Sequence, residues 1–180
     1  MRMFLNEILD FNLRCMGKLQ IVVEGNSMRP ILKPGDTIEI SKKKIYKIGD
    51  IVVFKEKDNR IVHRIIAYDQ EHLITKGDNV CYSDLPIMYE DIMGKVSSVD
   101  KGGKKYGTEL FETYNLFAET ISKWENQKTI HHKEAYRLGK KKGYLSDKLR
   151  HILIQLLLRL IYLKEMWCKQ KHERGTGIFM

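Results

Sequence analysis

The chain has 180 residues, of which 43% are hydrophobic and 31% charged, a composition typical of a folded domain and not of a disordered or fibrous chain. The net charge of +9 is unevenly distributed, since residues 1–100 contain 15 basic and 15 acidic residues and residues 101–180 contain 17 basic and 8 acidic ones. Three widely separated cysteines without a CxxC pair argue against a disulfide framework and favour a reducing compartment. No apolar run reaches the ~20 residues needed to cross a bilayer, and no signal peptide is predicted.

Apolar spacing within residues 1–18 predicts a short amphipathic helix. Over residues 19–100, short β-branched runs separated by Gly, Pro, Asp and Asn predict strands. These runs are LQIVV, DTIEI, DIVVFK, RIVHRIIAY, HLITK and DIMGKVSSV. EKDNR has the composition of a hairpin connection. Such closely spaced strands predict a bent antiparallel sheet or partial barrel.

The segment DKGGKKYG, residues 100–107, has the composition of a linker. We therefore predict an N-terminal helix over residues 1–18, a β-rich domain over 19–100 and a basic helical extension over 101–180. The expected fold class is α+β. Within the extension, apolar residues from Leu110 to Trp124 recur at spacings of four and three, which predicts one helical stripe.

The last predicted helix, residues 147–171, is mostly Leu and Ile apart from one narrow polar stripe. This stripe consists of Lys148, His151, Gln155, Arg159 and Tyr162. Three interpretations are open: packing onto the Leu110–Trp124 stripe or against a second copy in a homodimer, peripheral binding to a membrane, or contact with a transporter. No nucleic-acid partner is expected, because the basic residues come without a recognition motif.

The stretch GNSMRPILKPGD, residues 25–36, places Ser27 on a sharp bend. Its turn-forming residues are ordinary in a loop, but a bend also exposes a hydroxyl. Serine is a weak nucleophile without a neighbouring base, and the imidazole of His63, in the strand-like NRIVHRII, suits that role at neutral pH. The later segment LITKGDNVCYSDLP offers Asp78 and Asp84 to orient the ring. Each of these residues alone is unremarkable in a strand or loop.

Taken together, GNSMRPILKPGD, GDIVVFKEKDNRIVHRIIAY, LITKGDNVCYSD and YEDIMGKV resemble type I signal peptidases. They are most similar to the branch with a histidine base, found in the endoplasmic reticulum, archaea and some Gram-positive bacteria. The common bacterial branch and self-cleaving repressors of the LexA kind have lysine at the position of His63. The resemblance covers residues 19–99 and implies a β-rich fold and an endopeptidase that cuts after small residues without a metal or other cofactor.

By position, the resemblance implies that Ser27 is the nucleophile, His63 the general base and Asp84 the acid that orients it. Asp78 corresponds to a second aspartate that supports the site. Met28 and Pro30 are expected to form the wall beside the scissile bond.

Gly25 occupies a position where many signal peptidases have a serine that helps bind the oxyanion. The site is therefore expected to use backbone N–H groups, including that of Ser27, with help from Asn26.

Because the sequence predicts no membrane-spanning segment, we expect a cytoplasmic location, at most peripheral at the inner face of the membrane, and a precursor or leader peptide as substrate. Two other functions are open. One is a non-catalytic peptide-binding module of the same fold. The other is a self-processing LexA-like regulator, for which the residues before the first predicted strand are too few to form a DNA-reading module.

Overall fold

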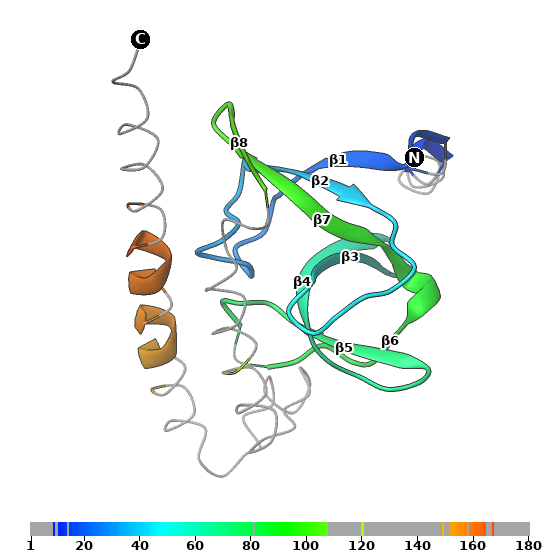
Figure 1. Ribbon diagram of the computed structural model, residues 1–180. Coiled ribbons are helices and arrows are strands. Elements are labelled where there is room, and N and C mark those ends of the chain that lie inside the picture. Colours follow the sequence, from blue (N-terminus) through cyan, green and yellow to red (C-terminus); the bar gives the residue numbers. More distant parts are fainter. Residues whose placement is uncertain are drawn as a thin grey trace.

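The computed structural model describes residues 9, 11–13, 15–80, 82–107, 120, 149, 152–157, 159–164 and 167. Its centre is an antiparallel sheet with the strand order β1-β2-β7-β3-β4-β5-β6, and β8 pairs with β7 (Figure 1). The strands are β1 (Lys18–Val22), β2 (Thr37–Ser41), β3 (Ile51–Glu56), β4 (Asn59–Tyr68), β5 (His72–Lys76), β6 (Ile87–Met88), β7 (Ile92–Lys101) and β8 (Lys104–Gly107). A 3-10 turn, η1 (Tyr89–Asp91), leads into β7.

The sheet curls so strongly that both faces of β3 are buried. Val53 belongs to one core cluster, with residues of β2 and β7, whereas Val52 and Phe54 belong to a second cluster with residues of β4 and β5. Register shifts interrupt three strand pairs, at Glu39/Ile40, Val53/Phe54 and Ile65/Ala67. Because such bulges increase local twist, they bend the sheet around its core. The predicted α+β class with a bent, β-rich sheet is confirmed.

Local composition predicts the turn after β3 correctly but not the turn after β7. The segment EKDNR forms the predicted hairpin, in which Glu56 pairs with Asn59 across a two-residue turn. The linker predicted for residues 100–107 is wrong, because Lys101 pairs with Lys104 and the segment forms the β7–β8 hairpin. Gly102 and Gly103 have φ values of 65° and 88°, and paired positive φ values are what a two-residue hairpin turn requires.

The sheet therefore extends beyond the predicted boundary at residue 100, and the division into three units stays a prediction. Near the N-terminus, residues 11–13 are helical and Leu13 packs into the core. Most of the predicted helix over residues 1–18 lies outside the described residues. So do all residues of the Leu110–Trp124 stripe and most of the segment that joins it to the last helix.

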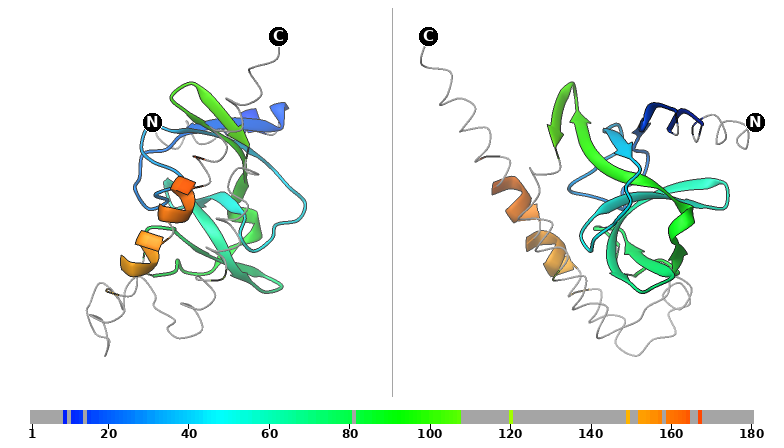
Figure 2. Two further views of the ribbon diagram at one scale, coloured as in Figure 1. Left: turned by 60° about the vertical axis from the view of Figure 1, so that its left-hand side comes forward. Right: turned by 45° about the vertical axis from the view of Figure 1, so that its right-hand side comes forward.

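Helical residues 152–157 and 159–164 lie along one side of the sheet (Figure 2). We call residues 152–164 the C-terminal helix. Gln155 is only 6% exposed, and Ile154 and Tyr162 pack against the core cluster that contains Met28. Two residues of the predicted polar stripe, Gln155 and Tyr162, thus face the sheet, while much of the Leu-rich surface faces outward.

Candidate active site

Ser27 lies in a turn that follows β1, and we call residues 25–32 the serine turn. The backbone of the turn is closed by a hydrogen bond of 2.9 Å from Leu32 N–H to Met28 O. The side chains of Met28, Ile31 and Leu32 are each 1% exposed, so they fix the turn to the core. Ser27 itself is only half-buried. The anchoring of its neighbours therefore holds the Ser27 hydroxyl at the surface in a defined position.

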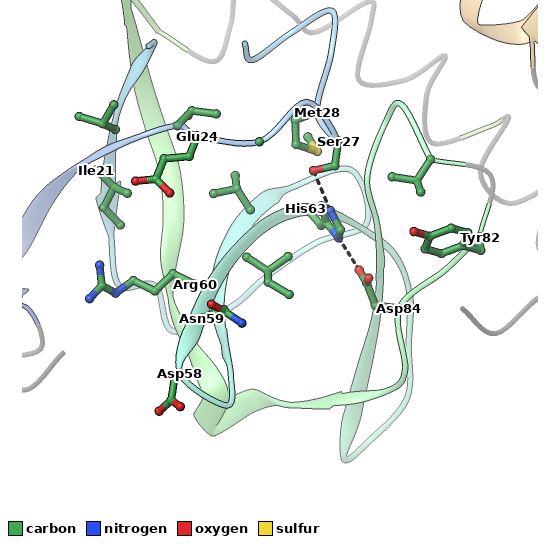
Figure 3. Close-up of a pocket in the computed structure, with 16 residues that line it drawn as sticks. Ile21, Glu24, Ser27, Met28, Asp58, Asn59, Arg60, His63, Tyr82 and Asp84 are labelled. Atoms are coloured by element: carbon green, nitrogen blue, oxygen red, sulfur yellow. Dashed lines mark hydrogen bonds and ion pairs between the residues drawn. The ribbon is translucent and has the colours of Figure 1, made fainter. Parts of the chain in front are cut away.

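His63 approaches Ser27 from the middle of β4. Its backbone is paired with Val52 of β3, and its side chain is 8% exposed. The ring makes an edge contact with Phe54, with a centroid separation of 6.3 Å. His63 Nε2 lies 3.0 Å from Ser27 Oγ, within hydrogen-bonding distance (Figure 3). Two segments far apart in the sequence thus meet at one polar contact.

The other ring nitrogen of His63 faces Asp84. His63 Nδ1 lies 2.5 Å from Asp84 Oδ2. The same carboxylate oxygen accepts a hydrogen bond of 2.7 Å from Thr75 Oγ1, and Asp84 N–H donates to Thr75 O at 2.8 Å. Asp84 is 5% exposed and Thr75 is fully buried. Thr75 therefore fixes the carboxylate from which the imidazole takes its orientation.

These contacts determine how the protons are shared when Asp84 is ionised. A carboxylate can only accept hydrogen bonds, so His63 Nδ1–H must donate to Asp84. In the neutral ring Nε2 then has a free lone pair and accepts the Ser27 O–H. The arrangement can accept a proton from serine, which is the chemistry required for nucleophilic attack.

The loop that follows β5, residues 77–80, closes over both Ser27 and His63. Asn79 N–H donates to Ser27 O at 2.6 Å, and Asn79 Nδ2 donates to Asn26 O at 3.2 Å. A Cβ atom on Gly77 would lie 2.8 Å from Ser27 O and 2.9 Å from His63 Nε2. The loop can reach this position only because residue 77 is glycine.

Asp78, in the same loop, points away from His63 and pairs with Arg64. Its two carboxylate oxygens accept hydrogen bonds of 2.8 Å from Arg64 Nε and 2.7 Å from Nη2. Arg64 is fully buried and also donates to Gly49 O at 2.8 Å. Loss of one member of a buried ion pair typically costs ~3–5 kcal/mol. The geometry gives Asp78 a supporting position, behind the loop and out of contact with the Ser27 hydroxyl.

A groove of about 530 Å³ leads to the Ser27 hydroxyl, and Figure 3 shows Glu24 on one side and Arg60 on the other. Of the four residues predicted to bind substrate, Gly25 and Met28 line the groove, whereas Asn26 and Pro30 lie outside its lining. Further lining residues come from β1 and the residue after it, the β3–β4 turn, β4 and the segment after β5: Ile21, Val22, Val23, Asp58, Asn59, Ile61, Val62, His63, Val80, Tyr82 and Asp84.

Sequence reasoning gave no role to Thr75, Gly77 or Asn79. All three lie in the stretch LITKGDNV, where a Gly-Asp-Asn sequence indicates only a loop. Their contacts are made with residues distant in sequence, so no local pattern could have revealed them. The sequence likewise indicated no role for Arg64, the residue next to His63. Strand alternation places the two side chains on opposite faces of β4.

The β-rich part of the chain is similar to a known protein family. Residues 17–97 match the family described as Peptidase S24-like. These residues are thus similar to S24-like peptidases over somewhat less than half of the chain. They include the serine turn, His63 and Asp84.

Relatives with similar sequences are catalytic subunits of signal peptidase complexes. The SEC11 subunit of Lachancea thermotolerans is 36% identical over 77 residues, which cover 37% of this chain and 45% of the relative. The subunit of Pyricularia oryzae is 36% identical over 80 residues, covering 39% and 46%, and that of Metarhizium robertsii is 32% identical over 93 residues, covering 42% and 54%. The chain thus spans about half the length of these relatives. Among the described residues, no helix has the length and apolar character needed to cross a membrane.

Replacing Gly77 by alanine tests whether the 77–80 loop must fit closely against Ser27 and His63. The added methyl group cannot be accommodated without moving Val80, the serine turn and His63, since all three contacts fall below 3.0 Å. Misplacement of reacting groups by ~1 Å can reduce rates about a hundred-fold, so we expect peptide cleavage by Gly77→Ala to fall by about that factor.

The control is Gly103→Ala in the β7–β8 turn, where φ is 88° and the space beside the residue is open. It strains the backbone and is expected to cost ~1 kcal/mol of stability, with no change in the rate per folded molecule. Cleavage rates and thermal unfolding of both variants separate the two effects. Undiminished cleavage by folded Gly77→Ala would contradict the close fit.

Proposed function

We propose that the protein is a serine endopeptidase in which Ser27 is the nucleophile, His63 the general base and Asp84 the residue that orients His63. The observation that carries this proposal is the continuous line of contacts from Ser27 Oγ to His63 Nε2 at 3.0 Å and from Nδ1 to Asp84 Oδ2 at 2.5 Å. The S24-like match and the signal peptidase relatives support peptide-bond hydrolysis as the reaction class.

In the proposed reaction, Ser27 Oγ attacks the scissile carbonyl carbon while its proton moves to His63 Nε2. Asp84 stabilises the resulting imidazolium through Nδ1–H. His63 then returns the proton to the leaving amine as the C–N bond breaks, which leaves an ester on Ser27. Water, deprotonated by His63, hydrolyses this ester and regenerates the hydroxyl.

The negative charge on the tetrahedral intermediate needs hydrogen-bond donors. Gly25 has no side chain that could donate such a hydrogen bond. A Cβ at this position would lie 4.0 Å from Ser27 Oγ, an ordinary contact, so a side chain could be accommodated there. We propose that backbone N–H groups of the serine turn, including that of Ser27, stabilise the oxyanion. Asn26 supports the turn through its carbonyl contact with Asn79.

The proposed substrate is a precursor or leader peptide with small residues before the scissile bond, as the resemblance to signal peptidases implies. The groove beside Ser27 supports this choice, because about 530 Å³ lies within the ~300–1,000 Å³ that ligand sites occupy and suits a short peptide segment. The cytoplasmic location stays a prediction.

Ser27→Ala is expected to abolish cleavage while leaving the fold intact. Without the nucleophile, the rate should fall by a factor on the order of 10³ or more, whereas loss of one hydrogen bond should change stability by only ~1 kcal/mol. Purified wild-type and variant proteins are incubated with synthetic peptides rich in Ala and Gly, and products are identified by mass spectrometry.

Intact mass of the protein alone is followed in parallel, because shortening of the wild type but not of Ser27→Ala would favour the self-processing alternative. If neither protein cuts any peptide while both bind peptides equally, the non-catalytic alternative is favoured. Equal cleavage by both proteins would refute the role of Ser27.

The activity should also fall on the acid side as His63 becomes protonated. An imidazolium cannot accept the serine proton, so kcat/KM is expected to drop about ten-fold per pH unit once the ring is charged. The dependence is measured with one cleaved peptide over a series of buffers, with thermal unfolding checked at each pH. Full activity of folded protein at a pH where the His63 ring is protonated would exclude His63 as the base.

The outward face of the C-terminal helix bears on the partners of this peptidase. Its most exposed apolar side chains recur at spacings of three and four, and Arg159 and Lys164 are exposed beside them. They are Leu149 (57%), Leu153 (67%), Leu156 (51%), Leu160 (64%), Leu163 (61%) and Trp167 (63%). Apolar surface flanked by cations matches an anionic lipid surface. We propose that this face binds anionic membranes peripherally.

Leu153→Glu combined with Leu160→Glu should prevent this binding. Wild-type protein is expected to sediment with vesicles containing phosphatidylglycerol and not with vesicles of phosphatidylcholine alone, because attraction between opposite charges strengthens interfacial binding. The control is Ile45→Glu, at a 76% exposed position in the β2–β3 loop, which should sediment like the wild type. A stable homodimer in light scattering that is lost in the double variant, without vesicle binding, would overturn the lipid assignment.

A further inference from the structure

Gln155 is a polar residue buried in an apolar stretch of the C-terminal helix. It is 6% exposed, and its neighbours from residue 152 to 158 are all Leu or Ile. Burial of an amide is unfavourable unless its polar atoms find partners. A leucine could be buried at this position without that cost. The amide is therefore expected to have a specific partner on the part of the fold that the helix packs against.

That partner is the backbone of the 77–80 loop. Gln155 Nε2 donates to Asp78 O, whereas Gln155 Oε1 is buried without a hydrogen-bond partner among the described residues. Asp78 stands between Gly77, which abuts His63, and Asn79, which binds the Ser27 carbonyl. The Asp78 side chain is meanwhile tied to Arg64. The helix therefore holds a loop whose residues contact both Ser27 and His63.

A second set of contacts seats the same helix behind the serine turn. The Lys101 ammonium lies 5.9 Å from the centroid of the Tyr162 ring, and Lys101 also donates to Ile31 O at 2.5 Å and to Asp36 Oδ2 at 2.7 Å. Burial, with the nearby charges of Asp36 and Tyr106, raises the pKa of Tyr162 to about 12, so its hydroxyl remains neutral. The helix thus contacts the rest of the fold at the 77–80 loop and at Lys101.

We propose that Gln155 is a positioning residue of the peptidase, through which the C-terminal helix sets the 77–80 loop and thereby the Ser27–His63 contact. This inference rests on the proposed function for its kinetic consequence, but its structural consequence is independent of it. When the amide is lost, the loop is released without disturbing the rest of the sheet.

The test uses Gln155→Leu in the full chain, which removes the hydrogen bond and keeps an apolar helix surface. The matched control is Gln70→Leu, the same substitution at an exposed position in the β4–β5 turn. Cleavage of a peptide that the wild type cuts should fall roughly three- to ten-fold in Gln155→Leu, the range of one net hydrogen bond, with the loss in kcat and little change in KM. Gln70→Leu should behave as wild type.

Amide hydrogen exchange provides a readout that a purely structural role would not move. The Asn79 N–H, bonded to Ser27 O at 2.6 Å, should exchange faster in Gln155→Leu, while the N–H of Val53 in the centre of the sheet exchanges as in the wild type. An equal increase at both sites, or a lower melting temperature that accounts for the activity loss, would reduce Gln155 to a structural residue.

Unchanged kcat together with unchanged Asn79 exchange in Gln155→Leu would overturn the proposal and leave the peptidase assignment intact. If the wild type cuts no peptide, the peptidase assignment fails, and exchange at Asn79 still decides whether the helix holds the loop.

Discussion

The fit of the 77–80 loop against Ser27 and His63 is the constraint on which the rest of the site depends. A glycine with no room for a methyl group, and a backbone N–H of Asn79 bonded to the Ser27 carbonyl, hold three distant segments in contact. The His63 imidazole and the Ser27 hydroxyl belong to separate elements of the fold, and without this fit they would not be held at a fixed distance from each other. The loop converts that arrangement into a site with a fixed hydrogen-bonding geometry.

Strand alternation gives β4 two different tasks. Because neighbouring side chains point to opposite faces of a strand, His63 faces the groove while Arg64 enters the interior and pairs with Asp78. The same strand therefore positions the proposed base and, through Asp78, anchors the loop that covers it. Because both faces of the neighbouring strand β3 are buried, β4 can direct Arg64 into the interior and His63 toward the groove.

The sequence predicts the elements with strong local patterns. β-branched runs bounded by turn residues predict β3, β4 and β5 to within a few residues. The resemblance to signal peptidases predicts that Ser27, His63 and Asp84 belong to one site. β6, with two residues, is too short to show a pattern. β8 was missed because glycine and lysine suggest a linker, although Gly102–Gly103 is also the composition of a tight hairpin turn.

The contacts of Gly77, Thr75 and Gln155 could not be predicted from sequence, because each depends on a partner brought close only by the fold. Gln155 shows this most clearly. It belongs to the predicted polar stripe of the helix, and in the fold it is buried against Asp78. Polarity on an amphipathic helix indicates solvent only when no polar backbone of a neighbouring element competes for the same face.

The protonation pattern of the His63 ring, measured by ¹⁵N NMR on folded protein at a pH where the ring is neutral, tests the relay most directly. The structure predicts that Nδ1 carries the proton, bonded to Asp84, and that Nε2 is an unprotonated acceptor whose resonance changes in Ser27→Ala. A neutral ring protonated at Nε2 in the wild type would mean that His63 cannot take the serine proton, and the account would be contradicted.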